Sequence, residues 1–185
     1  MWCSRAKPHL LTCEDWLCEA SGEPRYELLR EVAAQIGRLD ITCDMNPDLA
    51  PSSLPDMKMP SLKLLNIFNA DSAPVAFRIQ SENVPMLRVL ELARSKPKIL
   101  TPLTGVTHLH YSNLHLSEAG AQILSKLPNL QHLALTLGGF PARSRMPPIA
   151  LPLLTSLELK LASWVITTNV NSFLFLLDFF ELPNL

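Results

Sequence analysis

Three histidines are the residues whose type and spacing most suggest chemistry. His108 and His110 are separated by one residue, and His132 lies 24 residues after His108. Imidazoles that lie close together can bind zinc or exchange protons near neutral pH. No carboxylate or cysteine accompanies them in the same segments, so we interpret them as a polar ladder on a solvated surface. The sequence therefore predicts no metal site and no cofactor.

The motifs that mark common enzyme active sites are absent from the sequence. It contains no Gly-x-Ser-x-Gly, no His-Glu-x-x-His and no glycine-rich phosphate-binding loop. Cys43 with a distant histidine is a candidate nucleophile, but the neighbouring carboxylate of Asp44 disfavours a thiolate. We therefore predict no catalytic residues and no enzyme activity.

The composition favours a folded intracellular protein. Hydrophobic residues make up 48% and charged residues 18% of the 185 positions, which is enough to bury a core. The net charge of −1 gives no basic field for nucleic acid, and no long apolar stretch marks a membrane span. No signal peptide is evident, and the four cysteines form no Cys-x-x-Cys pair. We expect a reduced cytoplasmic or nuclear compartment, with neither nucleic acid nor membrane as a partner.

A repeated leucine pattern supplies the elements that would position these residues. Each unit consists of an apolar residue, any two residues, a leucine, any one residue and then a third apolar residue. The intervals between units run from 19 to 26 residues, apart from a last interval of 31, and most are typical of leucine-rich repeats. The units start at Ile36, Leu62, Leu87, Val106, Leu130, Leu154 and Leu185. Five carry a proline two positions earlier: Pro60, Pro85, Pro128, Pro152 and Pro183.

The end of each unit alternates apolar, polar, apolar, as in a strand that is buried on one side. Side by side, such strands form a parallel sheet whose leucines make one continuous core. The proline lacks an N–H and suits the position just before a strand. The chain should return over the outer face as helices at 25–36, 117–127 and 171–182, and as a loop or an irregular extended return at 138–152.

The predicted fold class is an α/β leucine-rich-repeat solenoid, an open horseshoe with parallel strands on its concave face and helices and loops on its convex face. Residues 1–35 are predicted as a lead-in with a helix, and residues 36–185 as the repeats, the last one truncated at 185. Many such repeats carry Asn or Cys three residues after the third leucine. These positions hold other residues here, so no asparagine ladder is expected.

The residues between and beside the two later leucines of a unit should point away from the core. Leu64, Phe68 and Val89 then place apolar groups on a face that is expected to meet water. Exposed apolar clusters often mark protein contacts, and the alternative is that a neighbouring loop covers them.

His108 and His132 should fall at the same place in adjacent strands, about 4.8 Å apart. Glu91 and Glu158 lie on the flanking strands of that face and could pair with the histidines. The predicted partner-binding residues are Leu64, Asn66, Phe68, Val89, Glu91, His108, His110, His132 and Glu158.

Three features together suggest a family. They are the Pro-x-Leu-x-x-Leu-x-Leu units, the Leu-Pro-Asn-Leu segments at 127–130 and 182–185, and the opening Trp2-Cys-Ser-Arg-Ala-Lys-Pro-His-Leu10. In these the sequence resembles the C-terminal leucine-rich region of fungal F-box-like proteins, and its opening resembles the segment that follows the F-box. The resemblance implies a substrate-recruiting subunit of a cullin-type ubiquitin ligase, whose repeats hold the target protein.

The F-box itself is not present in this chain. A Skp-type adaptor is therefore expected as a partner only if an F-box lies upstream in the full gene product. The abrupt end at Leu185, where a unit begins, also favours a partial gene product. The alternative is a free-standing leucine-rich-repeat binding module with no link to a ligase.

Overall fold

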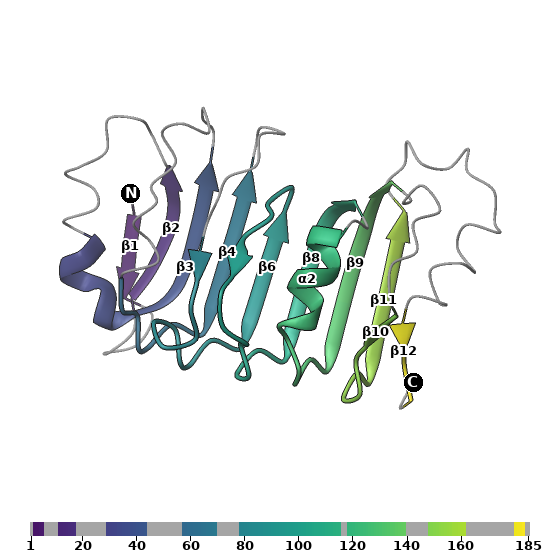
Figure 1. The fold of residues 1–185 in the computed structure, drawn as a ribbon. Coiled ribbons are helices and arrows are strands. Elements are labelled where there is room, and N and C mark those ends of the chain that lie inside the picture. The colour runs from purple at the N-terminus through teal and green to yellow at the C-terminus, as the bar shows by residue number, and fades with distance from the viewer. Residues whose placement is uncertain are drawn as a thin grey trace.

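The repeated units form one large sheet in the computed structural model, which describes residues 2–5, 11–17, 29–43, 57–69, 78–115, 118–139, 148–161 and 180–183. The sheet has the order β1-β2-β3-β4-β6-β8-β9-β11 (Figure 1). β1 and β2 are antiparallel, and every later neighbouring pair is parallel. The strands are β1 (Trp2–Arg5), β2 (Leu11–Leu17), β3 (Ile36–Cys43), β4 (Leu64–Asn69), β6 (Val89–Ala93), β8 (His108–His115), β9 (His132–Gly139) and β11 (Ser156–Leu161).

The predicted register of the leucines is confirmed from β3 to β11. The second apolar residue of each unit lies opposite its counterpart in the next strand, and so does the third. Stacking in this register joins the units into one core because no single strand can bury its apolar side alone. The two rows are Leu39, Leu65, Leu90, Leu109, Leu133 and Leu157, and Ile41, Ile67, Leu92, Tyr111, Leu135 and Leu159.

A tight turn before the strands explains the recurring proline. The N–H of Leu87 donates to the carbonyl of Val84 at 3.0 Å, three residues earlier, and four other described units repeat this bond. Proline is the second residue of four of these five turns, where its fixed φ suits a β-turn. The proline thus shapes a turn, and the strand begins only later in the unit. Each turn starts with a buried apolar residue that the sequence analysis missed: Met59, Val84, Leu103, Leu127 and Leu151.

The return segments form a second layer over the leucine side of the sheet, and few of them are helical. α2 (Glu118–Ser125) confirms the helix predicted at 117–127 and lies in front of the sheet in Figure 1. Residues 29–32 are helical and run into the 3₁₀ turn η1 (Ala33–Gln35), so the helix predicted at 25–36 is present from 29 to 35, whereas Ile36 already belongs to β3. The other described returns are extended and pair in twos: β5 (Arg78–Ile79) with β7 (Lys98–Ile99), and β10 (Ile149–Ala150) with β12 (Phe180–Glu181).

The helix predicted at 171–182 is wrong at its described end. Phe180 is buried and pairs with Ile149 as part of a strand, so tertiary pairing overrides the local helical preference. The rest of that segment lies outside the described residues. The segment 138–152, predicted as a loop or an irregular extended return, includes the end of β9 and the whole of β10, so its described part is extended.

Two strands precede the first predicted unit. β2 pairs in parallel with β3, so the sheet extends into the segment predicted as a lead-in. Cys13 lies opposite Leu39 and Trp16 lies opposite Ile41, which leaves one more residue between the partners in β2 than in β3. This β-bulge breaks the leucine spacing, and for this reason the sequence pattern did not reveal the strand. The described chain is a parallel-strand solenoid with few helices.

Candidate functional site

The described segments of the outer layer leave one face of the sheet uncovered, and we call it the open face. Its side chains alternate with the buried leucines along each strand, as expected for a pleated strand. All nine predicted partner-binding residues lie on it. From β3 to β11 the open face comprises Arg38, Asp40, Thr42, Leu64, Asn66, Phe68, Val89, Glu91, Ala93, His108, His110, Ser112, His132, Ala134, Thr136, Ser156, Glu158 and Lys160.

Three apolar side chains lie on the open face, over β4 and β6, and the row of Asn66 and Glu91 separates Phe68 from the other two. Leu64 lies opposite Val89 in the register, and Phe68 lies further along β4 opposite Ala93. Phe68 is 40% exposed, whereas Leu64 and Val89 are half-buried. A phenylalanine ring that is held in water without cover is costly. We call Leu64, Phe68 and Val89 the apolar patch.

The histidines meet as the sequence predicted. The carbonyl of Arg88 accepts hydrogen bonds from Thr107 and His108, and the carbonyl of Thr107 accepts them from Gln131 and His132. The bonds to the carbonyl of Thr107 set β8 and β9 in register, so His108 and His132 are direct partners. Their rings stack with centroids 4.2 Å apart and planes 24° apart.

The surroundings of His108 lower the pKa of its imidazole. Burial lowers the pKa of His108, and the nearby His132 and His110 lower it further. The hydroxyl of Thr107 lies 2.9 Å from Nδ1 of His108, within hydrogen-bond distance. Stacked rings 4.2 Å apart repel each other when both carry a proton. Protonation of His108 would therefore disturb the stacked pair.

The two predicted glutamates behave differently. Oε1 of Glu91 lies 3.7 Å from Nδ1 of His110, so this pair meets as expected. Glu158 instead pairs with Lys160, at 2.7 Å. The hydrogen bond from Lys160 and its charge lower the pKa of the Glu158 carboxyl, and His110 contributes only a smaller part. The alternation of side chains places Glu158 and Lys160 on one face of β11, which explains why Glu158 pairs with Lys160 and not with a histidine.

On β3, two charged side chains of the open face form an ion pair. Nε of Arg38 donates to Oδ2 of Asp40 at 2.8 Å, and a second bond of 3.2 Å joins the same two side chains. Asn66 lies between Asp40 and Glu91 in the register and is half-buried. The row of Asp40, Asn66 and Glu91 therefore runs between Phe68 and the Leu64–Val89 pair.

A buried hydroxyl network holds the end of β6, and sequence reasoning missed it. Tyr111 takes the place of a leucine in the core row, and its hydroxyl donates to the carbonyl of Ser95 at 2.6 Å. The hydroxyl of Ser95, which is fully buried, donates to the carbonyl of Ile67 at 3.2 Å. Burial raises the pKa of Tyr111. Ser95 lies three residues after Leu92, where many leucine-rich repeats carry Asn or Cys, and its hydroxyl binds a backbone carbonyl of the neighbouring strand β4.

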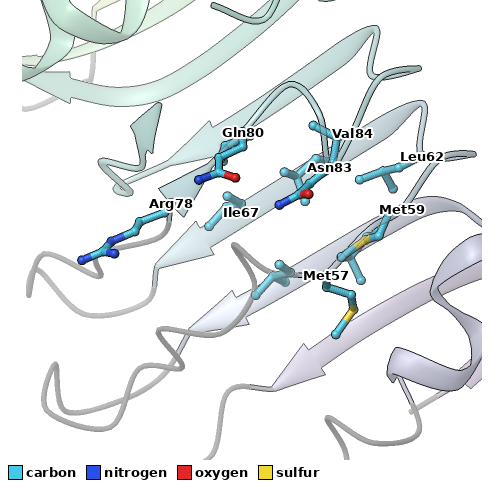
Figure 2. Close-up of a pocket in the computed structure, with 12 residues that line it drawn as sticks. Met57, Met59, Leu62, Ile67, Arg78, Gln80, Asn83 and Val84 are labelled. Atoms are coloured by element: carbon cyan, nitrogen blue, oxygen red, sulfur yellow. The ribbon is translucent and has the colours of Figure 1, made fainter. Parts of the chain in front are cut away.

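A small cavity lies between the sheet and the outer layer and is drawn in Figure 2. It has a volume of about 30 Å³ and is walled mostly by core side chains, including Met57, Met59 and Ile67. Arg78, Gln80 and Asn83 are its polar lining residues. This volume accommodates about two water molecules. The cavity is therefore a gap in the core packing beside flexible methionines.

Two further observations concern the described part of the chain. It brings together no group of three or more His, Cys, Asp or Glu side chains that could hold a metal ion. It also contains no helix with the length and apolar character that a membrane crossing requires.

No protein-family model, curated protein or solved structure matches this chain. The function therefore has to be argued from the solenoid and from its open face.

Proposed function

We propose that this protein is a leucine-rich-repeat module that binds another protein through its open face. The observation that carries the proposal is the apolar patch, with Phe68 exposed on a rigid sheet and bordered by polar side chains. Binding hot spots have this character: a large apolar or aromatic anchor inside a ring of polar residues that exclude water.

The repeat architecture supports a macromolecular partner. Parallel strands in register present their side chains in rows across the open face, and such extended surfaces suit a protein better than a small molecule. The paired charges around the patch, Arg38 with Asp40 and His110 with Glu91, offer groups that can orient a partner and select it. Neither pair is arranged as a catalytic nucleophile and base, so binding rather than catalysis is proposed.

The finer proposal is that the module is the substrate-recognition region of an F-box-type ubiquitin-ligase subunit. It rests on the resemblance of the proline-led leucine units and of the opening segment to fungal F-box-like proteins. A Skp-type adaptor would bind an F-box upstream, and the open face would hold the target. The alternative is a free-standing leucine-rich-repeat module that uses the same face without a ligase.

The test compares two substitutions that add the same charge at equally exposed apolar positions. Phe68 is 40% exposed on the open face, and Leu153 is 44% exposed in the turn before β11. Proteins captured by the tagged chain would be quantified for wild type, Phe68→Glu and Leu153→Glu. The proposal expects one or more partners to be lost with Phe68→Glu and retained with Leu153→Glu. Equal capture by both variants would contradict it.

The ligase proposal needs its own readout. The gene product would be expressed from its natural transcript start, and the capture would be probed for the Skp-type adaptor and the cullin. Their presence supports the ligase subunit. If the adaptor and the cullin are absent while Phe68-dependent partners are captured, the free-standing module is supported and the ligase proposal is contradicted.

A further inference from the structure

A groove in the outer layer has a charge pattern unlike that of the open face. It lies between β7 and α2 and encloses about 410 Å³, a volume typical of ligand pockets. Lys96, Lys98 and Lys126 line it, and no acidic residue is among its lining residues. Ile99 and Ile123 give it an apolar floor. Three cations are thus gathered in a chain whose net charge is −1.

Both walls of the groove are tied to the core. The β7 wall begins just after Ser95, whose backbone carbonyl accepts from Tyr111 and whose hydroxyl donates to Ile67. On the other wall, the N–H of Leu103 donates to the carbonyl of Lys126 at 2.9 Å. The lysines therefore stand on a fixed frame, which lowers the entropy cost of holding a ligand.

β7 presents an open strand edge to the groove. Among the residues that the structure describes, its sheet has two strands, and β7 pairs with β5 on one side alone. The N–H of Leu100 donates to the carbonyl of Ile79 at 2.9 Å. Because successive residues of a strand direct their backbone groups to opposite sides, those of Ile99 point away from β5. An extended chain can add to such an edge through main-chain hydrogen bonds.

We propose that this groove binds an extended acidic segment of a partner protein as a third strand beside β7. Its carboxylates would meet Lys96, Lys98 and Lys126, and aliphatic side chains between them would cover Ile99 and Ile123. The strand edge favours a peptide over a lipid headgroup, since a headgroup has no backbone to pair with it. The groove lies on the opposite side of the sheet from the apolar patch, so this site is separate from the one in the proposed function.

The experiment uses the full chain and a fluorescein-labelled peptide of alternating glutamate and valine, with binding followed by fluorescence anisotropy. The control peptide replaces each glutamate with glutamine. The test variant combines Lys96→Gln and Lys98→Gln, and the matched control combines Lys58→Gln and Lys63→Gln. All four lysines are exposed, and the two control lysines do not line the groove. Circular dichroism would verify that each variant is folded.

The proposal expects the test variant to bind the acidic peptide about tenfold more weakly than wild type, since each exposed ion pair contributes up to about 1 kcal/mol. The control variant should bind within about twofold of wild type, and salt should weaken binding. Equal losses in the two variants, or equal binding of the glutamine peptide, would overturn the proposal. Vesicles of phosphatidylserine that bind in a Lys96- and Lys98-dependent way while the peptide does not would overturn it in favour of a lipid headgroup.

Discussion

Leu133→Ala should lower the free energy of unfolding by about 3–5 kcal/mol. Leu133 is 2% exposed in β9, and its register partners are Leu109 in β8 and Leu157 in β11. Burying a leucine contributes about 1.5–3 kcal/mol, and a cavity that cannot collapse raises the cost of Leu→Ala within a range of about 2–5 kcal/mol. Paired strands on both sides hold the cavity open, so the upper part of that range is expected.

Urea unfolding of the full chain, followed by far-ultraviolet circular dichroism, would measure this loss. Leu157→Ala is the matched control because it occupies the same place in the next unit but is only half-buried. It should cost less, about 1–2 kcal/mol, and Ser156→Ala at an exposed position should stay within about 0.5 kcal/mol of wild type. A negligible effect of Leu133→Ala, or a larger effect of Leu157→Ala, would refute the register of the core.

Three other predictions follow from single contacts. Gly105→Ala should destabilise the fold by about 1–3 kcal/mol, because a Cβ there would lie 2.7 Å from the backbone carbonyl oxygen of Leu87. The loss would be seen as a lower temperature of thermal unfolding, and an unchanged temperature would contradict this packing. Tyr111→Phe should cost about 1–3 kcal/mol in urea unfolding, because the carbonyl of Ser95 loses a 2.6 Å hydrogen bond in the core; a neutral result would remove that role. The pKa of His108 is lowered below 6.5 on folding, so the folded state binds fewer protons than the unfolded state. The free energy of unfolding should therefore fall as the pH drops below 6.5, and His108→Asn should make this dependence on pH weaker. A free energy of unfolding that rises on acidification would contradict the prediction.

The sheet was predictable because its physical cause is periodic in the sequence. A strand that buries every second side chain needs Leu or Ile at fixed places, and the rows through Leu90 and Leu109 follow from that spacing. The open face was predictable for the same reason, since its residues are the alternate positions. Stacking of His108 on His132 follows from register alone.

The outer layer was less predictable because its segments differ in length and depend on one another. β5 and β7 are strands only because they pair across 20 residues of sequence, and Phe180 joins a strand through Ile149 rather than through local preference. In β2 the bulge between Cys13 and Trp16 hides the repeat. These outcomes depend on tertiary pairing, which a single sequence pattern does not contain.

The candidate site shows the same division. Which residues belong to the site follows from the alternation of side chains along each strand. Which of them form ion pairs depends on the length and direction of the side chains. Glu158 was expected to pair with the histidines, and Lys160 lies closer. The contacts of Ser95 and the basic groove beside β7 were not predictable from the pattern because each combines residues of different units.

The claim that the apolar patch receives a partner protein is tested most directly by site-specific photo-crosslinking. Benzoylphenylalanine would replace Phe68 on the open face in one variant and Met86 in another; Met86 is 44% exposed but lies in the turn before β6. The account predicts a crosslink to the captured partner from position 68 and none from position 86, with both variants as thermally stable as wild type. Crosslinking from position 86 alone, or equally from both, would contradict it.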